Sequence, residues 1–203
     1  MSSSIPQKPR IQRKERPKGR ITRSNYRQRA LPALVKDFEE RCAYSMQHTH
    51  NAGGKEHMEV DHFDPRKKND YIQIYSNLFL AKRACNNKKQ ANWPTKAELR
   101  QGIRFLNPCK EMDYGVHIFE DPDTHEVWGA TPAGRYHIRM TGLNSENLVA
   151  ERAKRSKLRM FLTKTPLTFK RSPDAFIVQA ITALKRELIL CIPEIPLKKK
   201  PPS

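Results

Sequence analysis

The chain has 203 residues, and its 39 lysine and arginine residues against 21 aspartate and glutamate residues give a formal net charge of +18. A charge of this size predicts a polyanionic partner, and nucleic acid is favoured over a membrane surface. No run approaches the roughly 18 apolar residues of a membrane span, and the N-terminus lacks the apolar segment of a signal peptide. Four scattered cysteines indicate a reducing compartment rather than a disulfide framework. We therefore expect a cytoplasmic protein without a membrane partner.

Residues 1–30 hold half of this charge, because ten lysines and arginines stand against Glu15 alone and give +9. Prolines and a glycine interrupt any helical pattern, so the stretch predicts a disordered basic arm. Such an arm can contact DNA phosphates or become ordered on a protein partner, and the sequence favours neither. The next segment, Leu31–Arg41, predicts an amphipathic helix.

The stretch 58–89 carries the candidate catalytic and metal-binding residues. Glu59–Phe63 predicts a short strand, which Pro65 ends because proline cannot donate to a sheet. Tyr71–Tyr75 is rich in β-forming residues and predicts a second strand. Apolar residues at helical spacing then predict a helix over Ser76–Lys89. The expected unit is strand, strand and helix.

The polar side chains of this unit suit metal-assisted hydrolysis of a phosphodiester. His62 has the pKa range of a general base, and Asp61 and Asn86 offer the hard oxygen ligands that Mg²⁺ or Mn²⁺ prefers. Asn77 and Asn86 are nine residues apart, which places them on opposite faces of one helix. We therefore assign Asn86 to the metal and Asn77 to bracing the loop after His62, and Asn87 remains an alternative ligand.

Three pieces in this order resemble the HNH (ββα-metal) endonucleases: Asp61-His62-Phe63-Asp64-Pro65, Asn77-Leu78, and Cys85-Asn86-Asn87-Lys88-Lys89. Each piece alone is typical of an ordinary loop, helix start or helix end, and the ordered set carries the resemblance. The resemblance implies a DNA endonuclease in which His62 activates water, Asn77 braces, and Asp61 with Asn86 holds one divalent metal. The lysine three residues after Asn86 matches the family pattern and favours Asn86 over Asn87.

Neighbouring residues extend this expected site. Glu59 shares a strand face with Asp61 by the alternation of side chains along a strand, so we expect it to support the metal ligands. Arg83, Lys88 and Lys89 are candidate nucleic-acid-binding residues that contact phosphates.

Many members of this family also hold a structural zinc with two Cys-x-x-Cys pairs, and this chain departs from that pattern. The matching positions are Cys42 with Ser45 and Lys82 with Cys85, so one cysteine of each pair is missing. Structural zinc needs four ligands, and we therefore expect no structural zinc. Replacement by His48, His50 or His57 is the less favoured alternative. An apolar contact of Cys42, Tyr44 and Cys85 is expected instead.

The second half of the chain changes pattern several times. A capping box predicts a helix over 94–104. Alternating segments at 115–120, 125–130 and 135–140 predict a three-stranded meander, and two further helices are predicted over 144–162 and from Ser172 onward. In the last helix Ile177, Ile181, Leu184 and Leu188 form an apolar seam, which indicates core packing or a protein interface.

These segments together predict an α+β fold, with a ββα-metal HNH core, flanking helices and a small antiparallel meander. The expected division is a basic arm over 1–30, the nuclease core over 31–105, and an accessory meander with C-terminal helices over 106–203. A second resemblance covers roughly residues 40–155, through Asn107-Pro108-Cys109, Gly115–Ile118, Gly134-Arg135 and Leu143-Asn144. It points to small bacterial anti-phage HNH effectors of the Septu and retron-associated type, and it implies a regulatory ATPase partner.

We therefore expect a magnesium- or manganese-dependent HNH endonuclease that hydrolyses DNA with weak sequence specificity in antiviral defence. The alternative is a catalytically silent nucleic-acid-binding or scaffold subunit that keeps the HNH fold.

Overall fold

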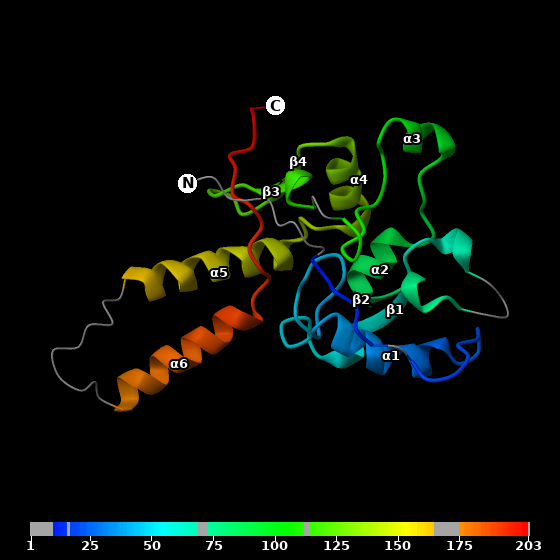
Figure 1. Cartoon of the computed structure of the whole chain (residues 1–203). Coiled ribbons are helices and arrows are strands. Elements are labelled where there is room, and N and C mark those ends of the chain that lie inside the picture. Colours follow the sequence, from blue (N-terminus) through cyan, green and yellow to red (C-terminus); the bar gives the residue numbers. More distant parts are fainter. Residues whose placement is uncertain (1–9, 16, 69–72, 112–113, 165–174, 203) are drawn as a thin grey trace.

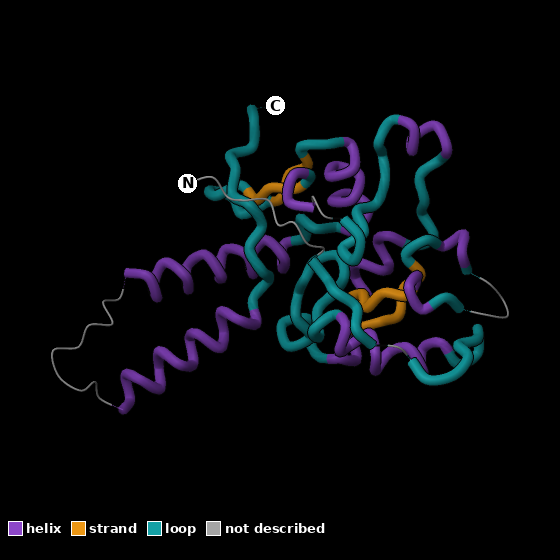
Figure 2. Tube along the Cα trace, viewed as in Figure 1, coloured by secondary structure: helices purple, strands orange, loops and turns teal. Residues whose placement is uncertain are grey.

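The computed structural model describes residues 10–15, 17–68, 73–111, 114–164 and 175–202. Helices and two small antiparallel sheets make an α+β fold, and the strands occupy two short patches among helices and loops (Figures 1 and 2). In chain order the elements are α1 Tyr26–Asp37, β1 Met58–His62, β2 Leu78–Lys82, α2 Arg83–Lys89, α3 Lys96–Arg100, β3 Ile118–Glu120, β4 Val127–Gly129, α4 Pro132–Thr141, α5 Glu146–Lys164 and α6 Ala175–Leu190. Short 3-10 turns cover Lys55–His57, Pro65–Lys67, Tyr75–Asn77 and Tyr114–Val116.

The first sheet pairs β1 with β2, from Met58 opposite Lys82 to His62 opposite Leu78. The first expected strand is therefore confirmed. The second was predicted at Tyr71–Tyr75, where residues 71 and 72 lie outside the described residues and 73–75 form no strand. The strand is instead Leu78–Lys82, inside the predicted helix, and the helix is shortened to α2.

The burial of β2 explains this error. Its residues 78–81 are all fully buried, because α1 packs on one side of the sheet and α2 on the other (Figure 1). A strand covered on both faces has no polar–apolar alternation, and a short apolar run then resembles a buried helix. Phe79 stacks on Phe63 with ring centroids 4.7 Å apart, and its ring centroid lies 5.5 Å from that of Phe38, which directly follows α1.

The described part of the basic N-terminal stretch packs on this core, which differs from the disordered arm that its composition predicts. Ile11 and Ile21 are buried in the main hydrophobic cluster. The guanidinium of Arg13 lies 4.9 Å from the ring centroid of Phe79 and donates to the carbonyl oxygens of Tyr75 and Leu78. Cation–π contacts and backbone carbonyl acceptors thus hold Arg13 against the core. Its charge alone predicts a solvent-exposed side chain.

The region after α2 begins with the predicted capping box and then departs from the expected meander. The capping box at Thr95 and Glu98 is present, and β3 pairs with β4. The third expected strand is wrong, because residues 132–141 form helix α4. The Thr131 hydroxyl accepts the N–H of Gly134, and Pro132 occupies the first helical turn, so Thr-Pro starts a helix here instead of ending a turn.

Helices α5 and α6 lie side by side and project away from the rest of the chain (Figure 1). Three residues of the predicted seam, Ile181, Leu184 and Leu188, are half-buried, while Phe176 and Ile189 are 76% and 70% exposed. Ser172, the predicted start of the last helix, lies outside the described residues. Within the described ranges, no helix combines the length and apolar character that crossing a membrane requires.

Candidate functional site

His62 ends β1 in a half-buried position between two residues from distant parts of the chain. Its ring lies 5.1 Å from the ring of Tyr26, measured between centroids, and Nε2 is 2.5 Å from Oε1 of Gln73. Burial lowers the pKa of His62 below its ordinary value, although the Gln73 hydrogen bond and the Asp61 charge act in the opposite direction. An amide oxygen only accepts, so Nε2 carries the proton and Nδ1 keeps the lone pair that a base needs.

Asn77 clamps the loop that follows His62. Its Oδ1 accepts the N–H of Asp64 at 2.9 Å, its Nδ2 donates to the Asp64 carbonyl at 2.9 Å, and its own carbonyl accepts the N–H of Phe63. The buried side chain closes a 3-10 turn directly before β2 and does not begin a helix. Asn77 and Asn86 therefore do not share one helix, contrary to the expectation that they lie on opposite faces of it, but Asn77 does brace the loop after His62.

Asp61 points into the protein, where it pairs with a buried lysine. The Nζ of Lys89 lies 3.1 Å from one carboxylate oxygen of Asp61, and also donates to the His62 carbonyl at 3.0 Å. The Tyr44 hydroxyl donates to the same carboxylate. Asp61 is 6% exposed and Lys89 is fully buried. The prediction that Lys89 contacts phosphate is therefore wrong: a lysine three residues after Asn86 faces the sheet, and solvent cannot reach it.

Glu59 and Asn86 form the more accessible half of this acidic edge. Asn86 Nδ2 donates to Glu59 Oε2 at 2.8 Å, and Arg83 Nε donates to Glu59 Oε1 at 2.8 Å. Burial acts to raise the pKa of Glu59, but the hydrogen bonds from Asn86 and Arg83 outweigh it and lower the pKa. Arg83, Asn86 and Lys89 are spaced by three residues on one side of α2, which turns all of them toward β1.

The donor set of this edge suits a hard divalent cation. Glu59, Asp61 and Asn86 carry only oxygen donors, the type that Mg²⁺ and Mn²⁺ prefer. A carboxylate has about four lone-pair positions, so the bonds from Lys89 and Tyr44 leave Asp61 with acceptor capacity. Asn86 and the alternative Asn87 both lie in α2, and Asn87 is exposed and shares no hydrogen bond with Glu59.

Three residues beside the site escaped the sequence reasoning. Tyr26 and Gln73 enclose the His62 ring, and Arg27 donates from Nε to the Tyr26 hydroxyl at 3.1 Å. The positive charge of Arg27 helps to lower the pKa of Glu59. No local sequence pattern indicates these residues. Tyr26 and Arg27 reach the site only because the first turn of α1 packs there in the folded chain. Arg83 and Arg27 are exposed, and they border the site with positive charge. Lys88 is also exposed, but it lies on another side of α2.

The four positions of the family's zinc pairs also meet in space. Cys42 is hydrogen-bonded to Cys85 and to Ser45, and the backbone of Lys82 also contacts Cys42. Tyr44 packs on Phe79 and His137. His48 and His50 interact with each other in their own loop. Among the described residues, no three histidine, cysteine or acidic side chains are grouped as metal ligands.

Comparison of the chain with protein-family models, with curated proteins and with solved structures finds no match. Functional inference therefore rests on the side chains around His62 and on the order of β1, β2 and α2.

Proposed function

We propose that the chain is a metal-dependent endonuclease of the HNH type that hydrolyses DNA phosphodiester bonds. The observation that carries the proposal is the setting of His62, whose neutral ring is fixed by Gln73 while Asn77 clamps the following loop. Beside it lies an edge of oxygen donors. A positioned base next to a hard-cation site is the combination that phosphodiester hydrolysis needs.

In the proposed reaction His62 accepts a proton from the attacking water at Nδ1. The adjacent Asp61 carboxylate stabilises the resulting imidazolium, since its charge already favours the protonated ring. Asp61 and Asn86 would hold Mg²⁺ or Mn²⁺, which when bound stabilises negative charge on the phosphate and on the leaving 3′ oxygen. Glu59 orients Asn86 through their hydrogen bond. Arg83 and Arg27 contact flanking phosphates.

We further propose that this nuclease is a weakly sequence-specific effector of anti-phage defence, regulated by an ATPase partner. The support is the sequence resemblance, together with the physical point that an unregulated nonspecific nuclease would damage its own cell. Apolar side chains on the projecting helices offer a docking surface: Met160, Phe161, Phe176, Ile177 and Val178 are each at least 41% exposed. Exposed apolar patches of this kind commonly mark protein interfaces.

One observation favours the alternative of a catalytically silent binding subunit. Both oxygens of Asp61 are engaged by Lys89 and Tyr44 in a position that solvent scarcely reaches. A carboxylate that serves only to neutralise a buried lysine would leave the site without its main metal ligand. Such a protein would bind DNA in a salt-dependent way and cut none.

Nicking of supercoiled plasmid separates the two proposals. The purified chain is incubated with Mg²⁺, with Mn²⁺, or with EDTA, alone and with the protein encoded beside it. Cleavage with either metal and none with EDTA supports the nuclease. Tight DNA binding without cleavage under all conditions, partner included, supports the silent subunit.

A further inference from the structure

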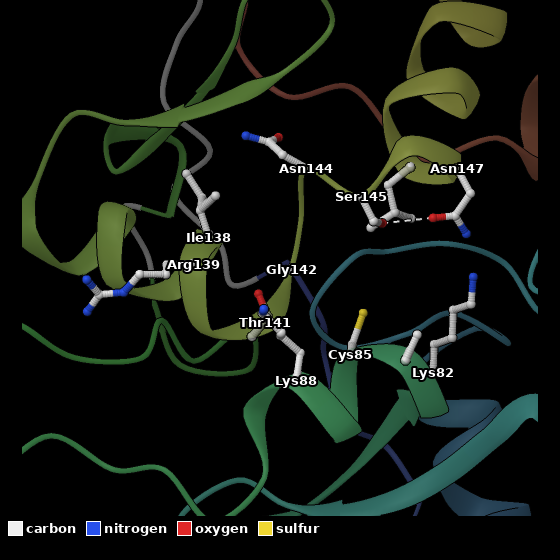
Figure 3. A pocket seen from close by; sticks show the side chains of 12 residues that line it. Lys82, Cys85, Lys88, Ile138, Arg139, Thr141, Gly142, Asn144, Ser145 and Asn147 are labelled. Atoms are coloured by element: carbon white, nitrogen blue, oxygen red, sulfur yellow. Dashed lines mark hydrogen bonds between the residues drawn. The ribbon is translucent and has the colours of Figure 1, made fainter.

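A pocket of about 480 Å³ lies between α2, α4 and the start of α5, on the side of α2 away from Glu59 and Asp61 (Figure 3). Lys82, Cys85 and Lys88 come from one wall, and Ile138 with Gly142 comes from the opposite wall. Such a volume falls in the range of small-molecule sites. Residues 86 and 88 are about 200° apart around a helix, so this pocket is distinct from the proposed catalytic edge.

The described residues that line the pocket give it positive charge. Of the described residues that line it, none is acidic. Lys82 Nζ donates to the neutral amide oxygen of Gln47, at 2.7 Å. Among the described residues, neither Lys82 nor Lys88 has a carboxylate within ion-pair distance. Arg139 stands at the rim, and its guanidinium points away from the pocket in Figure 3. A concave surface with one sign of charge concentrates the field and attracts anions.

The rest of the lining is mainly apolar, and the stem of Lys88 packs beside a glycine. Ala84, Cys85, Ile138 and Leu148 supply aliphatic and thiol surface. Gly142 ends α4 with a φ of +65°, and a Cβ there would lie 3.4 Å from Cγ of Lys88. The glycine therefore provides the left-handed turn, and the Lys88 stem packs beside it.

From this combination we propose that the pocket binds a nucleotide, with the phosphate at Lys88 and the base against Ile138 and Leu148. A phosphate alone would not use the apolar lining, and an uncharged apolar ligand would not use the lysines. Ser145 and Asn147, which are hydrogen-bonded to each other at 2.8 Å, offer polar contacts at the edge. The nucleotide is either one unit of a bound DNA strand or a free mononucleotide, since both present the same chemistry.

Titration calorimetry in EDTA and low salt tests this with the intact chain. The probes are dAMP, deoxyadenosine, inorganic phosphate and a single-stranded 12-mer. Lys88→Gln removes the phosphate contact, and Ala84→Phe fills the pocket without changing its charge. Lys96→Gln and Ala97→Phe make the same changes at exposed positions of α3. Circular dichroism of each variant establishes that it is folded.

We expect dAMP to bind one site more tightly than phosphate or deoxyadenosine, and both pocket variants to weaken it about tenfold or more. The α3 variants retain wild-type affinity. If Ala84→Phe weakens the 12-mer as much as dAMP, the ligand is a strand unit; if only dAMP is affected, it is a free nucleotide. Equal losses in Lys88→Gln and Lys96→Gln, wild-type binding by Ala84→Phe, or no saturable binding of dAMP would each overturn the proposal. None of these results depends on whether the chain cleaves DNA.

Discussion

The buried ammonium of Lys89 determines how the carboxylates of the site respond to substitution. It is fully buried and compensated by Asp61 and by the His62 carbonyl. Replacing one partner of such a pair leaves the other charge buried and unpaired, which typically costs about 3–5 kcal/mol. We therefore predict that Lys89→Met lowers the free energy of unfolding by about that amount in urea denaturation. A loss below about 1 kcal/mol would contradict the buried pairing.

The same pairing complicates any test of Asp61 as a metal ligand, because loss of activity in Asp61→Ala could reflect loss of folding. Asp61→Asn keeps the shape of the side chain, and the double variant with Lys89→Met removes both charges together. Activity lost in the double variant while its unfolding free energy recovers toward wild type would point to metal binding rather than stability.

At the scale of single elements, α4 is joined to the core by a histidine that must stay neutral. His137 is fully buried, and its Nδ1 accepts the N–H of Leu106 at 3.2 Å. Burial lowers the pKa of His137 to about 3. In the unfolded chain it titrates near pH 6.5, so its share of the stability is present above pH 6.5 and is lost as the pH falls toward 3.

We predict that this histidine alone destabilises the fold by about 2 kcal/mol between pH 7 and pH 5, because each pH unit below the unfolded pKa costs about 1.4 kcal/mol. Urea denaturation at the two pH values measures the difference in wild type and in His137→Gln. The variant should lose most of that pH dependence. An equal pH dependence in both proteins would argue against the neutral buried histidine.

The N-terminal segment depends on Arg13, which contacts Phe38, Tyr75 and Phe79 and caps two carbonyl groups. Arg13→Ala should destabilise the chain by about 2–4 kcal/mol through lost cation–π contacts and unsatisfied carbonyls. The exposed Lys18 is the matched control, and its replacement by alanine should change stability by less than about 0.5 kcal/mol. Equal stabilities of the two variants would mean that the segment adds nothing to the core.

Elements with a local signal were predictable, and those set by tertiary contacts were not. Strand β1 carries its polar and apolar residues at strand spacing, and the capping box of α3 lies within four residues. Strand β2 was missed because both its faces are covered, and α4 because Thr131-Pro132 suits a turn as well as a helix start. Within the site, Asp61, His62 and Asn77 were identified from order and spacing, whereas Tyr26 and Gln73 reach His62 only through the folded chain.

At the scale of the whole molecule, the net charge of +18 should dominate association with DNA. If about six phosphates are contacted, affinity should fall roughly a thousandfold between 50 and 200 mM salt. Fluorescence anisotropy with two unrelated duplexes measures both this slope and the specificity. Similar affinities and equal slopes are expected. A flat salt dependence, or a strong preference for one duplex, would contradict binding through phosphates.

Partner binding is also a property of the whole molecule, and the packing of the N-terminal stretch changes how it should be tested. Deleting residues 1–30 would remove Ile11, Arg13 and Ile21 from the core together with the first turn of α1. Polar replacement of the exposed Phe176 or Val178 on α6 is the better probe of a docking surface, since neither residue supports the core.

The central claim is that His62 is the base of a metal-dependent nuclease. The most direct measurement is the rate of plasmid cleavage in Mg²⁺ by wild type, His62→Ala and His57→Ala, with the neighbouring protein included if wild type needs it. His57 is exposed and lies in the turn before β1, so its variant is the matched control. We predict that His62→Ala loses at least about 100-fold in rate with DNA affinity retained, while His57→Ala cleaves like wild type. Cleavage by His62→Ala at the wild-type rate would contradict it.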